Sequence, residues 1–119
     1  MGRELTERER DVMRYMLDAA VPLEGDEPVS RQIRQRLRQD LHSARAGERC
    51  ACGDCPSIVI EDQDGITPET GQRVVLSAAA PNASVLLFID GGRLSYLELA
   101  PHDDEPVHEF PPVAHLSVN

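Results

Sequence analysis

The sequence predicts a single α+β domain, in which two N-terminal helices pack on a four-stranded antiparallel meander that is followed by an irregular tail. Two changes along the chain indicate this fold. Apolar residues recur at helical spacing in the first part of the chain and at extended, β-rich spacing after the cysteines. Charge changes at the same place, because residues 1–49 hold ten arginines and ten acidic residues, whereas residues 50–119 hold two arginines and eleven acidic residues. The domain, residues 1–119, divides into a helical part (1–49), a cysteine loop (50–56), an antiparallel sheet (57–100) and a proline-rich acidic tail (101–119).

The first helix begins at Thr6. Its hydroxyl can accept a hydrogen bond from the third helical residue, Glu9, whose carboxylate can reach back to the Thr6 N–H group, as in a capping box. Pro22 and Gly25 end the helix. The residues that recur at helical spacing and supply one buried face are Val12, Met13, Met16, Leu17 and Ala20.

The second helix is expected to contain Pro28 in its first turn, after Asp26 and Glu27, whose charges suit the positive end of the helix dipole. Its apolar stripe consists of Val29, Ile33, Leu37 and Leu41, and Gly47 closes the segment. Beside the stripe lie Arg31, Arg34 and Arg38. Lysine is absent and no aromatic platform accompanies these arginines, so we interpret them as a solvated face that pairs with acids of the first helix, rather than a phosphate site.

Four segments rich in β-branched and large aliphatic residues predict strands: Ser57–Glu61, Arg73–Ala78, Val85–Ile89 and Arg93–Leu99. Asp90-Gly91-Gly92 predicts a tight hairpin, because such turns need positive φ angles at their centre. Without a bulge, Val85, Leu87 and Ile89 share a face with Leu94 and Tyr96, while Leu86 and Phe88 share the other face with Ser95, Leu97 and Leu99.

Both faces of this predicted sheet carry large apolar residues, whereas two helices cover only one face. The second face therefore needs a cover, and two remain open. One is the acidic tail, with Phe110, Val113 and Leu116 as anchors. The other is a protein partner or a second copy of the chain in a homodimer.

The cysteines of this chain, Cys50, Cys52 and Cys55, fall within six residues. Thiolates at this spacing can converge on one metal ion, and zinc takes four tetrahedral ligands, so a tentative zinc site needs one more donor. His102 and His42 are equal candidates for that donor, because a meander brings the end of its fourth strand and the end of the second helix near the loop. Behind them stand His108, His115 and Asp54.

Two alternatives stay open for the cysteines. Cys52 and Cys55 form a Cys-x-x-Cys pair, which suits thiol redox chemistry, and three soft sulfurs also suit Cu(I). The cysteines can also be inert thiols that a reducing cytoplasm preserves.

The segment Cys-x-Cys-Gly-x-Cys-Pro-Ser-Ile, with the later Leu-Phe-Ile-Asp-Gly-Gly-Arg-Leu-Ser-Tyr-Leu-Glu, resembles a group of small uncharacterised bacterial proteins. The resemblance spans Cys50 to about Leu99. It implies no substrate, since that family has no assigned role, but it implies that the loop and the hairpin form one unit.

The chain carries a net charge of −9, which argues against nucleic acid as a partner. No apolar run approaches the ~20 residues that span a bilayer, and the first residues are polar, so we expect a cytoplasmic protein. Sequence neighbours such as His102 and Asp103 rarely make a catalytic dyad. The sequence therefore predicts a non-catalytic protein that binds another protein, for example an inhibitor or immunity-type protein for a basic partner.

Overall fold

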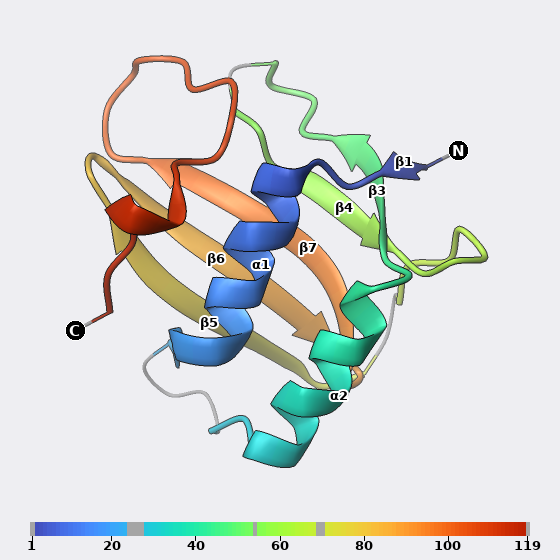
Figure 1. The fold of residues 1–119 in the computed structure, drawn as a ribbon. Coiled ribbons are helices and arrows are strands. Elements are labelled where there is room, and N and C mark those ends of the chain that lie inside the picture. Colours follow the sequence, from blue (N-terminus) through green and yellow to red (C-terminus); the bar gives the residue numbers. More distant parts are fainter. Residues whose placement is uncertain (1, 24–27, 54, 69–70, 119) are drawn as a thin grey trace.

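The computed structural model describes residues 2–23, 28–53, 55–68 and 71–118, which form one antiparallel seven-stranded sheet with two α-helices on one face (Figure 1). The elements are β1 (Arg3–Glu4), α1 (Glu7–Ala19), β2 (Val21–Pro22), α2 (Arg31–Leu41), β3 (Arg45–Arg49), β4 (Ile58–Glu61), β5 (Arg73–Ala80), β6 (Ala83–Asp90), β7 (Arg93–Pro101) and the 3₁₀ turn η1 (Val113–His115). The strands lie in the order β1-β3-β4-β7-β6-β5-β2.

The predicted four-stranded meander is wrong, although the α+β class holds. Of the four predicted strands, β5, β6 and β7 follow one another as hairpins, but β4 pairs with β7 instead of β5. Three further strands extend the two edges. β1 and β2 have two residues each, too few to show a period, and β3 is largely polar, with Ala46 as its fully buried residue. Strands that are this short or this polar leave little hydrophobic pattern in a sequence.

The β6–β7 hairpin turns on Gly91 and Gly92, with φ angles of 59° and 78°, as the sequence predicts. Its register then shifts, because Ile89 pairs with Leu94 whereas Phe88 pairs with Tyr96. The extra residue, Ser95, makes a β-bulge and reverses the alternation of faces beyond it. The predicted sharing of faces is therefore wrong for much of β7: Leu97 and Leu99 join the core face, and Tyr96 leaves it.

The tail does not cover the second face of the sheet. Phe110 and Leu116 are buried anchors, as predicted, but they belong to the same core cluster as the residues of α1. Arg8 of α1 donates a hydrogen bond to the Phe110 carbonyl at 2.8 Å, and Ser117 pairs with Ala79 at the end of β5. The tail thus extends the helix-covered layer, and within the described residues no helix lies over the other face (Figure 1).

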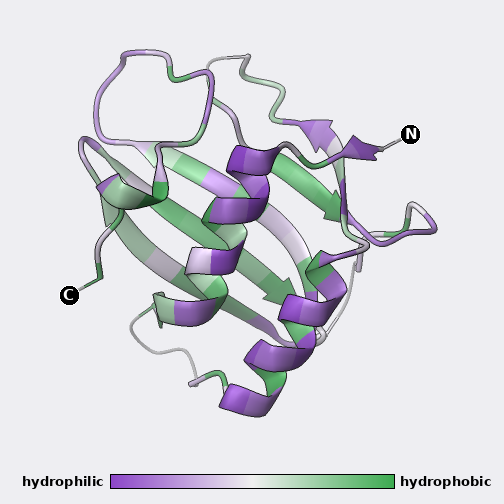
Figure 2. Ribbon diagram, in the orientation of Figure 1, coloured by the Kyte–Doolittle hydropathy of each residue, from purple (hydrophilic) through white to green (hydrophobic). Residues whose placement is uncertain are grey.

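The helix α1 begins as predicted, because Thr6 and Glu9 form the capping box, and Glu9 also accepts two hydrogen bonds from Arg3, each of 2.9 Å. Its inner face packs on the hydrophobic strands, whereas many outward residues of both helices are hydrophilic (Figure 2). Among the described residues, neither helix is long and apolar enough to cross a membrane.

The helix α2 begins later than predicted, with Ser30 as N-cap, so Pro28 lies outside it; Asp26 and Glu27 lie outside the described residues. Gly47 lies in β3, beyond the helix end. Leu37 and Leu41 are buried as predicted, but Ile33 is exposed.

The interpretation of the arginines of α2 holds for Arg38, which contacts an acidic residue of α1, but not for Arg34, which contacts backbone carbonyls. Arg38 pairs with Asp18 of α1 at 2.8 Å. Arg34 donates hydrogen bonds to the carbonyls of Leu17 and Ala20 at 3.0 and 2.9 Å, which are among the carbonyls that a helix end leaves unpaired. Arg34 therefore stabilises the end of α1 and ties the two helices together.

We expect Arg34→Met to lower the free energy of unfolding by about 2 kcal/mol, because the carbonyls at the end of α1 lose a charged donor. Arg31→Met is the matched control, since Arg31 is exposed on the same helix. Urea unfolding of both variants measures the difference. Equal stabilities of the two variants would contradict this role of Arg34.

We also expect the capping box to make stability depend on pH. Burial raises the pKa of Glu9, but hydrogen bonds from Arg3 and Thr6 lower it more, so the pKa lies below its ordinary value. The unfolded state then binds the proton more tightly, so this stabilisation is complete above the ordinary pKa and is lost as pH falls through the folded one. In urea unfolding between about pH 3 and pH 7, Glu9→Gln should flatten this slope and cost about 1 kcal/mol at neutral pH. The exposed first-turn variant Glu7→Gln should keep the slope; parallel pH profiles for wild type and Glu9→Gln would count against the prediction.

Candidate metal site

The cysteine loop is the connection of the β3–β4 hairpin. Cys50 directly follows β3 and its N–H group donates to the carbonyl of Ser57, just before β4, at 2.9 Å. Gly53 turns the chain back with a φ angle of 75°, which glycine adopts without steric cost. Asp54, a lower-ranked candidate ligand, lies outside the described residues. The hydrogen bond between Cys50 and Ser57 therefore sets the two ends of the loop.

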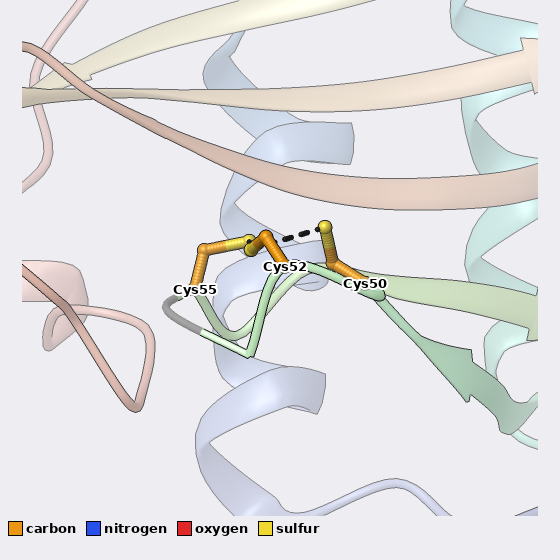
Figure 3. A group of neighbouring side chains, drawn as sticks. All are labelled: Cys50, Cys52 and Cys55. Carbon is orange, nitrogen blue, oxygen red and sulfur yellow. Dashed lines mark hydrogen bonds between the residues drawn. The ribbon is translucent and has the colours of Figure 1, made fainter.

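The sulfurs of the three cysteines point toward one another (Figure 3). Each outer sulfur, of Cys50 or Cys55, lies 3.3 Å from the sulfur of Cys52, and all three lie within 4.8 Å of one another. Sulfurs bound to one tetrahedral zinc ion at about 2.3 Å are about 3.8 Å apart, so only a small outward movement is needed. The three cysteines can hold a metal ion, as their spacing in the sequence predicts.

A buried serine supports one of these sulfurs. Ser57 is 1% exposed, and its hydroxyl accepts a hydrogen bond from the Leu99 N–H group at 2.9 Å. The Cys55 thiol donates to the same hydroxyl at 3.4 Å. Burial raises the pKa of Cys55, but hydrogen bonds with Ser57, Cys52 and Cys50 together lower it below its ordinary value. The sulfur site is thus linked to β7 through one hydroxyl.

Tyr96 shows on which face of the sheet the sulfurs lie. Its ring packs edge-on against the ring of Phe88, with 5.7 Å between the two ring centroids, on the face that no described helix covers. Burial raises the pKa of Tyr96, and the neighbouring Cys50, Glu98 and Cys55 raise it further, while a hydrogen bond with Ser57 lowers it. The cysteines therefore share the outer face of the sheet with Tyr96.

The structure does not bring the predicted histidines into this group of sulfurs. The ring of His102 lies 3.0 Å from the Ser84 hydroxyl of β6, across β7 from the cysteine loop. His42 caps the end of α2, and the five residues of β3, about 16 Å at 3.3 Å per residue, separate it from Cys50. Among the described residues, the ligand atoms within 4.8 Å of one another belong to the three cysteines.

The remaining histidines lie in the tail. His108 lines a cavity with Pro56 and Phe110, on the helix-covered side, although Pro56 directly follows Cys55. His115 is exposed in η1 and lines a second cavity, formed by the tail. Each therefore lies on the side of the sheet away from Tyr96.

Ser57 and Tyr96 belong to the site, but sequence reasoning did not single them out. Ser57 could have been noticed as a hydroxyl at the first position of a predicted buried strand, two residues from a cysteine. Tyr96 gave no usable signal, because the bulge at Ser95 places it on the opposite face from the one predicted.

No known protein family, no curated protein and no solved structure matches this chain.

Proposed function

We propose that this protein is a small zinc-binding protein, in which Cys50, Cys52 and Cys55 hold the ion as thiolates and pin the β3–β4 hairpin. The convergence of the three sulfurs carries the proposal. Thiolate is a preferred zinc ligand, and a structural zinc ion contributes directly to the stability of the segment that binds it. The residues present fit such an ion, since the sulfurs need little movement. The fourth donor is a histidine or Asp54 after rearrangement, a water molecule, or a group from a partner.

We further propose that the protein acts by binding another protein, without catalysis of its own. The outer face of the sheet supports this part, because Val59, Leu86, Phe88 and Tyr96 lie there half-buried with no described helix above them. The net charge of −9 favours a basic partner. A cytoplasmic location suits three thiols that lie this close together without forming a disulfide, since that compartment keeps thiols reduced.

Metal titration tests the zinc proposal. We expect protein purified without added metal to bind one equivalent of Zn²⁺, seen as a mass increase in native mass spectrometry, and to give a thiolate-to-cobalt absorption band with Co²⁺. Cys52→Ser should weaken zinc binding by about 100-fold or more, because Cys52 lies next to both other sulfurs.

Ala51→Ser is the matched control, since it adds the same side chain at an exposed position of the same loop and removes no sulfur. It should bind zinc like the wild type. A wild-type chain that keeps its bare mass at excess zinc, with no cobalt band, would exclude the proposal.

A second function, thiol redox chemistry, is favoured by the 3.3 Å distance between the Cys52 and Cys55 sulfurs in a Cys-x-x-Cys segment. One thiolate attacks a disulfide oxidant such as oxidised glutathione and releases one thiol; the other then attacks the mixed disulfide and releases the second. The protein loses two protons and two electrons, and the oxidant is reduced to two thiols.

Oxidation in the absence of metal and alkylation in the presence of zinc separate the two functions. If the redox function holds, Cys50→Ser should still form the Cys52–Cys55 disulfide within minutes, detected as the loss of two hydrogen atoms and one bridged peptide. If the zinc function holds, all three cysteines of the wild type should resist alkylation until a chelator removes the metal. Fast alkylation at saturating zinc would speak against a structural zinc site.

A further inference from the structure

The hydroxyl of Ser57 is a fully buried polar group directly beside the sulfur site. Buried hydroxyls are unfavourable unless they are hydrogen-bonded, so such a group is not explained by packing alone. Ser57 has three sets of neighbours: the backbone of Leu99 in β7, the sulfur of Cys55 and the side chain of Tyr96. It lies at the start of β4, where Cys50 also closes the hairpin through the Ser57 carbonyl. Ser57 therefore connects the start of β4 to the neighbouring strand β7.

The hydrogen bonds of this hydroxyl depend on whether Cys55 carries a proton. The Leu99 N–H group occupies one acceptor position in either case. In the thiol form, Cys55 donates its proton to Ser57, and the hydroxyl hydrogen is directed to the Leu99 carbonyl, at 3.4 Å, with the Tyr96 side chain as a second neighbour. That distance is long for a hydrogen bond between two oxygens, which is usually about 2.7–2.8 Å. The hydrogen bond from the Ser57 hydroxyl to the Leu99 carbonyl is therefore weak.

A metal-bound thiolate has no proton to donate and becomes an acceptor. At 3.4 Å from the Cys55 sulfur, the Ser57 hydroxyl can turn its hydrogen from the Leu99 carbonyl to the sulfur without moving its oxygen. The bond that it gives up is long, and the bond that it gains is to a charged acceptor, which is stronger than one to a neutral acceptor. The Leu99 N–H group keeps the oxygen in place throughout.

We infer that Ser57 is a positioning residue of the metal site: its hydroxyl donates a hydrogen bond to the metal-bound sulfur of Cys55 and anchors that sulfur to β7. The inference rests on the proposed function. Groups that hydrogen-bond to metal ligands orient them and tune the metal, as Ser57 does here for one of three thiolates. Cys55 is thereby the ligand whose sulfur is anchored to β7.

Three variants at this position test the inference. Ser57→Ala should weaken Zn²⁺ binding by about 10–100-fold in competition with a chromophoric chelator. It should also move the thiolate-to-cobalt band of the Co²⁺ protein to longer wavelength, because the sulfur loses a hydrogen bond that stabilises its lone pair. Ser57→Thr, which keeps the hydroxyl, should restore both. Ser57→Val has the shape of the threonine variant without its hydroxyl, so the Thr and Val pair gives the same comparison if the alanine variant does not fold.

Ser95→Ala is the matched control. Ser95 is also buried and its hydroxyl donates to the Phe88 carbonyl at 3.2 Å, but no sulfur contacts it. It should lower stability and leave both the zinc affinity and the cobalt band unchanged. If Ser57→Ala and Ser57→Val, folded by circular dichroism, match the wild type in affinity and band position, Ser57 has no positioning role although the zinc site stands. If the wild type itself binds neither metal, the proposed function falls and this inference with it.

Discussion

Ser95 adds one residue to β7 opposite β6, and this β-bulge decides which side chains of β7 enter the core. Side chains alternate between the faces of a strand, so one extra residue reverses the alternation beyond it. The reversal buries Leu97 and Leu99 among the residues that α1 covers and leaves Glu98 on the outer face. Without the bulge, the carboxylate of Glu98 would face the apolar interior unpaired, which is strongly unfavourable.

The same β-bulge arranges the surroundings of the cysteines. Tyr96 moves to the outer face, where its hydroxyl lies near Cys50 and Cys55. The backbone of Leu99 meets the Ser57 hydroxyl, and that contact links the cysteine loop to the middle of the sheet. The three sulfurs therefore lie at the end of a hairpin whose position β7 sets, although β7 is far away in the sequence.

The parts of the fold that the sequence predicted are those that depend on neighbouring residues. The capping box of Thr6 and Glu9, the Gly91-Gly92 turn and the amphipathic face of α1 each follow from residues a few positions apart. The convergence of the cysteines was predictable for the same reason, because a turn at Gly53 within a six-residue segment can bring its sulfurs together. The beginning of α2 was misplaced, since Ser30 and Pro28 are both acceptable near a helix start.

By itself, the sequence determined the secondary structure of the central strands, the start of α1 and the cluster of thiols, whereas α1 ends at Ala19 and Pro22 lies in β2. Tertiary structure decided the strand order, the three strands added outside β4 and β5, the face on which Tyr96 lies, and the distance of His42 and His102 from the sulfurs. The physical reason is the separation of the interacting residues along the sequence. A turn or a cap depends on the conformational free energy of a few adjacent residues. The pairing of β4 with β7 depends instead on burying Ile58 and Leu97 together, and such a pairing leaves no mark on either segment alone.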